Sequence, residues 1–455
     1  MSTKIQVSIA LFTRDLRVHD NPVLHAASRS HRVVPLFVID QSILDSAFVR
    51  ANRAAFLAES LDDLDAGLRD LGGRLVVRRG DVVEQVRRVA AETGASELHL
   101  AADVSSYAQQ RARKLHEALA EDNCAVFVHD TVITAVPPGE ITPSGNDHFA
   151  VFTPYFRRWN AVPKRSPLPP PDHLQLPRIR VGTVPTSETL CAGETSPERP
   201  AGGEQHARRR LEEWEQGVQR YADAGDDLAA DATSRLSPYL HFGCLSAIEI
   251  LHRIDAANPG TEAFVRQLAW RDFHHQVLDA RPACSHRDYR GHGDRWRRDE
   301  RALQAWKQGR TGYPIVDAGM RQLAREGWMH NRARLIVASF LTKTLYVDWR
   351  SGAQHFLDLL VDGDIANNQM NWQWAAGTGT DTRPNRVLNP LSQAKRYDPR
   401  GDYVRRYVPE LADVPGAAVH RPWELEPNTR AKLDYPEPIV ELDEGARRFR
   451  AARGK

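Results

Sequence analysis

The chain has 455 residues, of which 41% are hydrophobic and 26% are charged, and its formal net charge is +2. This length corresponds to roughly three average domains or two large ones, and the near-neutral balance excludes a polycation that binds nucleic acid through its overall charge. Any such binding needs a local patch. The segment 281–310 is a candidate, with nine Arg or Lys and four acidic residues, although a solvated loop would explain its charge equally well.

The four cysteines show no paired spacing, so the sequence predicts neither a disulfide framework nor a zinc or iron–sulfur site. No small-residue cleavage site follows the first apolar run, and no segment reaches the roughly 18 apolar residues of a membrane span. We therefore expect a protein of the reducing cytoplasm without bound metal or membrane contact.

The first 130 residues alternate between short apolar runs and segments of helical period. Expected strands cover residues 5–12, 33–39, 74–77, 97–101 and 125–129. Helical spacing fills 50–71, and Asp81 with Glu84 forms a capping box at the start of another helix. This alternation predicts an α/β domain over 1–130 with a doubly wound parallel sheet of about five strands, which binds ligands at the carboxyl ends of its strands. Neither G-x-G-x-x-G nor a P-loop follows a strand, so an ordinary nucleotide site is not expected.

Residues 131–203 are rich in Pro, Gly, Ser and Thr without sustained period, which indicates a linker. From residue 204 to 455 the pattern becomes helical, with expected helices at 214–221, 264–278, 315–325 and 329–345. Pro314 suits a first helical turn and Gly327 a helix C-cap. The sequence therefore predicts an all-α C-terminal domain.

The segment 362–374, DGDIANNQMNWQW, combines two carboxylates, several amides and two tryptophans. Burying such groups requires a hydrogen-bond partner for nearly every polar atom, and a flat ligand with polar edges would supply those partners. A surface turn anchored by two tryptophans is the alternative for an isolated Asp-Gly-Asp.

Three further segments mix polar and apolar groups in ways that suit a ligand. Segment 233–239, TSRLSPY, offers hydroxyls, Arg235 and a helix start at Ser237 and Pro238, which would suit a phosphate, although a plain N-cap is commoner. Segment 328–335, WMHNRARL, places Asn331, Arg334 and Leu335 on one helical face. Segment 267–273, QLAWRDF, repeats the combination of amide, Trp and Arg.

Together these segments resemble the photolyase and cryptochrome family of flavoproteins. The resemblance runs from residues 12–17, FTRDLR, through 233–240, 270–273, 309–320, 327–335 and 362–381 to the tail segments 408–411 and 434–436. It implies an α/β antenna domain, a linker and a helical domain that holds FAD, active in its reduced form. The flavin contacts implied by position are Tyr221, Thr233, Ser234, Arg235, Leu236, Ser237, Arg271, Asn331, Arg334, Asp362, Asp364 and Asn368.

The resemblance places Asn368 at the reactive ring nitrogen of the flavin. Repair enzymes of the family carry Asn there, whereas plant cryptochromes typically carry Asp and animal cryptochromes Cys. A neutral amide contacts the reduced flavin without adding a second negative charge. Trp372, Trp349 and Trp296 fall where relatives keep an electron-hopping chain, although ordinary core packing is the alternative for any tryptophan.

The expected substrate is UV-damaged DNA carrying a cyclobutane pyrimidine dimer, which is flipped out of the duplex into a pocket, as photolyases are known to do. Trp270 and Trp374 match the aromatic walls of that pocket, with Asn331 and Leu335 also at the substrate. Arg332, Arg386 and the basic segment would hold flanking phosphates.

Three positions bear on which lesion is repaired. Most class I cyclobutane-dimer photolyases have Glu where this chain has Gln267, and an amide cannot supply a carboxylic proton. Relatives that repair (6-4) photoproducts use two histidines at the positions of Asn331 and Leu335, so (6-4) repair is disfavoured.

The antenna chromophore is expected to be 8-hydroxy-5-deazaflavin, with methenyltetrahydrofolate as the alternative. Segment 37–53 and the region of Asp103 resemble deazaflavin-binding members, and Ser285 beside Cys284 lacks the Lys often seen with folate. Arg53 and Asp103 are the expected contacts, unless both are surface ions.

The resemblance thus implies a class I cyclobutane pyrimidine dimer photolyase, a carbon–carbon lyase. We expect it to be a cytoplasmic monomer without an obligate protein partner, associated with the nucleoid if bacterial. One alternative is a cryptochrome-type photoreceptor, disfavoured by Asn368 and by the short basic tail. Another is a glycosyltransferase that binds a metal and a nucleotide sugar through the Asp-Gly-Asp of 362–364, which the helical surroundings disfavour.

Overall fold

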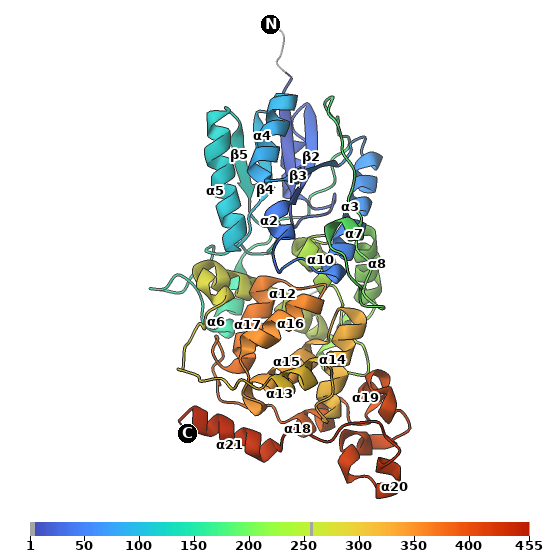
Figure 1. The fold of residues 1–455 in the computed structure, drawn as a ribbon. Helices are drawn as coiled ribbons and strands as arrows, with labels where there is room; N and C mark the ends of the chain where they lie inside the picture. Colours follow the sequence, from blue (N-terminus) through green and yellow to red (C-terminus); the bar gives the residue numbers. More distant parts are fainter. Residues whose placement is uncertain (1–4, 255–257, 455) are drawn as a thin grey trace. The chain divides into compact units, whose positions relative to one another are not determined.

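The computed structural model describes residues 5–254 and 258–454. They form two compact units (Figure 1). Unit 1 contains Met1–Thr195, Pro200–Gln219 and Ser234–Pro282, and unit 2 contains Ser196–Arg199, Arg220–Thr233 and Ala283–Lys455. The expected boundaries at residues 130 and 203 do not coincide with this division. In the described residues, no helix has the length and apolar character needed to cross a membrane.

Unit 1 is built on a five-stranded parallel sheet in the order β3-β2-β1-β4-β5, which confirms the predicted α/β fold. The strands are β1 (Val7–Phe12), β2 (Arg32–Asp40), β3 (Val76–Gly80), β4 (Glu97–Ala101) and β5 (Ala125–His129). Every residue of β1 is buried, as expected for a central strand covered on both faces. β4 and β5 have the predicted bounds. β3 begins two residues later than predicted, because its pairing with β2 starts at Val76.

The connecting helices cover the sheet. α1 (Pro22–Ala27) packs on β1 and β4, whereas α4 (Val82–Thr93) packs on β2 and β3 and beside α5 (Ser106–Glu121) (Figure 1). Between them in sequence lie α2 (Gln41–Leu44) and α3 (Ala51–Asp70). One hydrogen bond of the predicted capping box is confirmed: the Asp81 side chain accepts a hydrogen bond from the backbone amide of Glu84 at 2.9 Å.

Two segments in the middle of the chain have helices that differ from those predicted. The expected linker 131–203 contains α6 (Phe152–Ala161) and the short α7 (Ser187–Leu190). Apolar residues at 152, 155, 156 and 159 give α6 a buried face at helical spacing, which the surrounding Pro and Gly obscured. The predicted helix 214–221 lies further upstream as α8 (Glu204–Glu215), and only a 3-10 turn (Val218–Arg220) and α9 (Tyr221–Ala224) follow.

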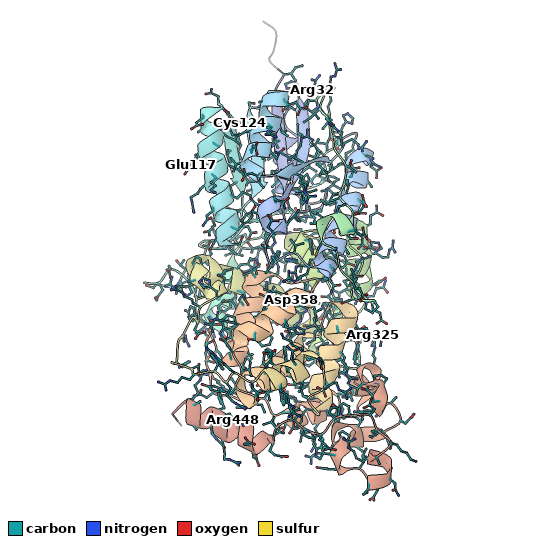
Figure 2. The ribbon with its side chains drawn as sticks, in the orientation of Figure 1. Arg32, Glu117, Cys124, Arg325, Asp358 and Arg448 are labelled. Carbon is teal, nitrogen blue, oxygen red and sulfur yellow. The ribbon has the colours of Figure 1, made fainter. Side chains whose placement is uncertain are left out.

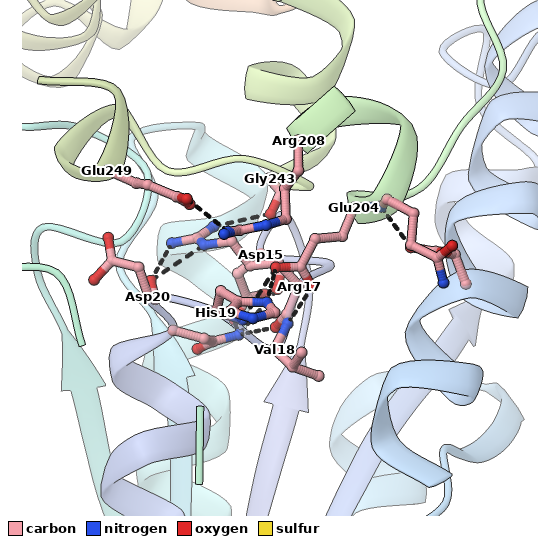
Figure 3. A network of polar contacts seen from close by, with 12 residues as sticks. Asp15, Arg17, Val18, His19, Asp20, Glu204, Arg208, Gly243 and Glu249 are labelled. Atoms are coloured by element: carbon pink, nitrogen blue, oxygen red, sulfur yellow. Dashed lines mark hydrogen bonds and ion pairs between the residues drawn. The ribbon is translucent and has the colours of Figure 1, made fainter. Parts of the chain in front are cut away.

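The remaining helices of unit 1 are α10 (Ser237–Phe242), α11 (Ala247–Arg253) and α12 (Pro259–Ala280). A polar network anchors the segment after β1 to α8 and α10 (Figure 3). The buried Arg17 donates to the carbonyl oxygen of Gly243 at 2.9 Å, and Glu204 accepts from the Val18 amide at 2.7 Å and pairs with His19. These bonds satisfy backbone groups that would otherwise be buried without partners.

Unit 2 is helical and confirms the predicted all-α character. Its helices are α9, α13 (Glu300–Lys307), α14 (Pro314–Glu326), α15 (Asn331–Ser339), α16 (Trp349–Leu359), α17 (Ile365–Ala376), α18 (Pro390–Tyr397), α19 (Asp402–Tyr407), α20 (Pro427–Arg430) and α21 (Leu442–Ala452). Pro314 lies in the first turn of α14, and Gly327 ends that helix with a φ of 59°, as predicted. The predicted helix 329–345 begins two residues late and continues from Phe340 to Thr344 as a π-helical turn.

Side chains fill the spaces between these helices (Figure 2). A buried hydrophobic cluster of unit 2 includes Trp306, Trp349, Phe340, Phe356 and Trp372. Burial of such aromatic area is the main stabilising term for a helical unit of this kind.

Candidate functional site

The segment 362–374 forms the start and body of α17. Asp364 is the N-cap, because its Oδ1 accepts hydrogen bonds from the backbone amide of Asn367 at 2.8 Å and from the Asn367 side chain at 2.7 Å. Gly377 ends the helix with a φ of 76°. The Asp-Gly-Asp turn therefore orients the amide side chains of α17.

Arg334 and Asp362 form an ion pair between α15 and the turn before α17. The Arg334 Nη2 atom lies 2.8 Å from Asp362 Oδ2, and Arg334 Nε donates to the carbonyl oxygen of Met329 at 2.8 Å. The Asp362 side chain is 3% exposed and that of Arg334 is 24% exposed. The pair holds a buried carboxylate beside a guanidinium that still reaches solvent.

These groups line a pocket of about 60 Å³ in unit 2. Its amide groups belong to Asn331, Asn367, Asn368 and Asn371, and Arg334 and Asp362 contribute the charges. Its apolar surface is formed by Leu335, Ala338, Phe356, Leu360 and Trp372. The pocket thus combines a hydrogen-bonding rim with a flat apolar wall, which suits a planar heteroaromatic ligand with polar edges.

The structure brings together six of the predicted site residues in this pocket: Asn331, Arg334, Leu335, Asp362, Asn368 and Trp372. Sequence reasoning did not single out Ala338, Phe356 or Leu360, since apolar residues of a helix give no signal of lining a pocket rather than a core. Asn367 and Asn371 were in the noted segment without an assigned role. Their spacing of four residues on α17 was the available signal.

Asn368 is fixed by its neighbours. Its Nδ2 donates to the carbonyl oxygen of Ala353 on α16 at 3.1 Å and lies 3.3 Å from Gln369 Oε1. With the nitrogen held in this way, Oδ1 is the atom that Asn368 can offer to a ligand as a hydrogen-bond acceptor.

Gln373 has a structural role that the sequence reasoning missed. It is fully buried, accepts a hydrogen bond from the Tyr289 amide at 2.7 Å, and donates to the carbonyl oxygens of Cys284 and Arg287. Gln373 therefore attaches the start of the basic segment 281–310 to α17.

The predicted electron-transfer tryptophans all lie in unit 2. Trp372 and Trp349 are buried in the core, and the six-membered ring of Trp372 packs against Gly352, one turn after Trp349 on α16. Trp296 is half-buried, and its ring lies 4.9 Å from that of Tyr346. Trp306, which the sequence did not distinguish, is also buried, with its ring 5.9 Å from Trp372.

Other predicted residues of unit 2 lie outside this pocket. Tyr221 begins α9, and burial raises the pKa of its hydroxyl to about 12. Thr233 belongs to unit 2 as well. Arg332 pairs with Asp226 at 2.7 Å and stacks over Tyr397, so it is partly neutralised. Arg386 is exposed, and Trp374 packs partly buried against the core.

In unit 1, α12 carries three predicted residues. Gln267 is exposed, Trp270 stacks on Phe152 of α6 with ring centroids 3.7 Å apart, and Arg271 donates to the carbonyl oxygens of Ile133 and Leu240. The missed helix α6 therefore supports Trp270.

Residues 234–236 of the predicted phosphate segment precede α10 in unit 1, and residues 237–239 form its first turn. Ser237 is the first residue of α10 rather than its N-cap, which is Leu236 without a side-chain cap bond. The Oγ of Ser234 accepts from the Leu236 amide at 3.3 Å, and the Ser234 carbonyl accepts from Arg210. Arg235 has a φ of 53°, in the left-handed region.

Both expected antenna residues lie in unit 1, Asp103 at the carboxyl end of β4 and Arg53 in the first turn of α3. Asp103 follows β4 and pairs with Arg14, which follows β1, at 3.4 Å. β1 and β4 are neighbours in the sheet, and the strand order runs outward from them in opposite directions, through β2 on one side and to β5 on the other. Doubly wound sheets bind ligands at the carboxyl ends of their strands at such a point. The Asp103 carboxylate also lies near Arg111, a residue without a sequence signal, whose pKa is lowered by burial. Arg53 donates to the carbonyl oxygen of Phe48 and covers its ring.

Comparison with known proteins gives consistent matches along the chain. The model for "DNA photolyase" matches residues 8–172, and the model for "FAD binding domain of DNA photolyase" matches residues 264–455. A deoxyribodipyrimidine photo-lyase of Streptomyces griseus is 58% identical over 99% of this chain and 100% of its own length. A bacterial class III photolyase from Agrobacterium tumefaciens has a TM-score of 0.91 at 33% identity, with 100% of this chain and 98% of that chain covered. A cryptochrome of Synechocystis has a TM-score of 0.90 at 28% identity, covering 99% and 100%.

Proposed function

The chain belongs to the photolyase/cryptochrome family, and we propose that it is a class I DNA photolyase that splits cyclobutane pyrimidine dimers in UV-damaged DNA under blue light. The proposal is supported by relatives named deoxyribodipyrimidine photo-lyase, one of them 58% identical over nearly the whole chain. The structural observation that carries it is the amide-lined pocket of unit 2, which lies within the part of the chain matched by the FAD-binding model.

The residues of the pocket fit a flavin. The apolar wall of Leu335, Phe356 and Trp372 suits the face of an isoalloxazine ring, and the amides suit its polar edge. The Arg334–Asp362 pair places a positive charge beside the pocket, where it would stabilise a bound anion. FAD, when bound and reduced, supplies the electron that blue light transfers to the dimer.

The chain's own residues position and tune these groups. Asn368 would contact the reactive edge of the ring through Oδ1, and its neutrality avoids a second negative charge near Asp362. Trp372, Trp349 and Trp296 would carry electrons inward from the surface when the flavin is oxidised. Thr233, Ser234, Arg235, Leu236 and Ser237 are proposed for the phosphates, with Tyr221, Arg271, Asn331, Arg334, Asp362 and Asp364 as the other contacts.

For the substrate, Trp270 and Trp374 are each proposed to stack on the extruded dimer, since stacking on aromatic rings compensates for lost base stacking. Gln267 is proposed to hydrogen-bond a pyrimidine edge without donating a carboxylic proton. Arg386 and Arg332 are proposed to contact flanking phosphates, with Asp226 competing for Arg332.

The antenna chromophore is proposed to be 8-hydroxy-5-deazaflavin in unit 1. The support is the position of Asp103 at the carboxyl end of β4 and the neighbouring cations Arg14 and Arg111. Methenyltetrahydrofolate is the alternative. Denaturing the purified protein and recording the absorption spectrum of each released chromophore would distinguish the two.

A cryptochrome-type photoreceptor is the second candidate, because the Synechocystis cryptochrome shares the fold at a TM-score of 0.90. One experiment separates the two functions. Purified protein with reductant is mixed with UV-irradiated DNA, illuminated with blue light, and assayed for remaining dimers. Loss of dimers in the light and not in the dark supports repair. Retention of dimers by protein that contains reduced flavin would refute it.

A further inference from the structure

Tyr346 is locked against Trp296 by both ring and backbone contacts. The ring centroids lie 4.9 Å apart at an interplanar angle of 41°. The backbone amide of Arg297, next to Trp296, donates to the Tyr346 carbonyl oxygen at 2.8 Å, and Arg297 forms a bridge with Val347. Tyr346 has a φ of 58°, a conformation that non-glycine residues rarely adopt. The fold therefore holds these two rings in a fixed pair.

The hydroxyl of Tyr346 is bound to a buried carboxylate. It donates to Asp294 Oδ1 at 2.9 Å, and Arg453 Nε lies 2.7 Å from the same oxygen. The side chains of Asp294 and Arg453 are 1% and 4% exposed. Burial, together with the hydrogen bond to Asp294, raises the pKa of Tyr346 to about 12. The phenol is thus protonated at neutral pH, with a base already hydrogen-bonded to its proton.

We infer that Tyr346 is the terminal electron donor to Trp296 and that Asp294 accepts its proton. This inference rests on the proposed function, in which light moves an electron from Trp372 to bound oxidised flavin and the resulting electron vacancy moves through Trp349 to Trp296. The Trp296 radical cation then takes one electron from Tyr346 and becomes neutral tryptophan. The O–H bond of Tyr346 breaks, its proton passes to an Asp294 oxygen, and a neutral tyrosyl radical remains. Charge and atoms balance within these three residues.

The arrangement has a physical advantage over a chain that ends at Trp296. Trp296 is half-buried, whereas Tyr346 is only 3% exposed, so the vacancy moves to a more protected ring. An oxidised phenol is a far stronger acid than a carboxylic acid, so proton transfer to Asp294 is downhill. Return of the electron from the flavin then requires return of the proton, which slows recombination. Arg453 places its guanidinium beside the Asp294 carboxylate and ties the C-terminal end of α21 to the site.

The first test follows radicals in the holoenzyme with oxidised flavin after a blue flash, by transient absorption and electron paramagnetic resonance. Wild-type protein is expected to show a tryptophan radical that is replaced by a tyrosyl radical, with slower replacement in D₂O. Tyr346→Phe should lose the tyrosyl signal and the isotope effect, and its tryptophan radical should persist. Asp294→Asn, which keeps a hydrogen-bond acceptor, should slow the replacement.

Tyr407→Phe is the matched control. Tyr407 is buried and donates its hydroxyl to a carboxylate, Glu326, but its ring packs on Tyr403. This variant should behave as wild type. A tyrosyl signal that survives in Tyr346→Phe and vanishes in Tyr407→Phe would overturn the inference, as would a wild-type protein in which only tryptophan radicals form.

The second test needs no flavin and therefore separates this inference from the proposed function. Pulse radiolysis of the full chain with azidyl radicals oxidises tryptophans directly, and the subsequent rise of tyrosyl absorption is recorded. Tyr346→Phe should remove the part of the tyrosyl absorption that arises from electron transfer to Trp296. Trp296→Phe should cause an equal loss. If flash photoreduction fails but this transfer is seen, only the proposed light chemistry is wrong. If Tyr346→Phe folds normally and leaves the rise unchanged, the Tyr346 assignment is wrong.

Discussion

Gly352→Ala tests the contact between α16 and Trp372. A methyl group at Gly352 would lie 2.2 Å from Cη2 and 2.5 Å from Cζ3 of Trp372, and 2.6 Å from a Cδ atom of Leu341. Both neighbours belong to the buried core of unit 2, so neither can swing into solvent. In an open helix position, Gly to Ala stabilises by about 0.5–1 kcal/mol, whereas overpacking of a core costs about 1–3 kcal/mol.

We therefore expect Gly352→Ala to lower the free energy of unfolding by roughly 1 kcal/mol, the difference between the midpoints of these two ranges. Displacement of the Trp372 ring should also lower the yield of flavin photoreduction, since electron tunnelling weakens steeply with distance. Thermal unfolding and the absorbance change under blue light measure the two effects in the same sample.

Gly291→Ala is the matched control, because a Cβ there meets nothing within 4 Å. It should leave both measurements unchanged. The reasoning is refuted if Gly352→Ala melts at or above the wild-type temperature with an unaltered photoreduction yield, since the methyl group would then have been accommodated without moving Trp372.

The remaining predictions concern the pocket, the electron chain, a buried lysine and the DNA contact. Asn368→Asp should change which flavin redox state accumulates, because a carboxylate would add negative charge near Asp362; absorption spectra during photoreduction check this, and identical spectra would contradict it. Trp372→Phe should abolish photoreduction of oxidised flavin while leaving circular dichroism unchanged, and retained photoreduction would indicate another route. Burial lowers the pKa of Lys343 to about 8 from 10.5, so between those pH values the unfolded chain binds more protons and stability rises with pH. The expected rise is roughly 3 kcal/mol, and Lys343→Met should remove that part of the pH dependence in urea titrations. Arg386→Ala should reduce the slope of log affinity against log salt for damaged DNA by about one, and an unchanged slope would exclude a phosphate contact at this residue.

The pocket was predictable in its polar part and not in its apolar part. Segment 362–374 stood out because carboxylates and amides beside tryptophans are unusual together in a buried segment. Leu335 was expected at the site through its spacing from Asn331. Phe356 lies on α16 and Leu360 directly follows that helix, and the apolar residues of α16 have the spacing of a face buried in a core. No local pattern shows that part of this face borders a cavity. The same limit applies to Gln373, whose three partners lie more than 80 residues away in sequence.

The sequence by itself determined features that depend on a few neighbouring residues. The runs at 97–101 and 125–129 became strands, Pro314 began a helix and Gly327 ended it, because backbone preference and hydrophobic period act locally. Only the tertiary structure decided which distant elements meet: α6 behind Trp270, Gly352 against Trp372, and Tyr346 between Trp296 and Asp294. Such contacts depend on how whole helices pack, and packing is selected by the combined burial of many side chains rather than by any one segment.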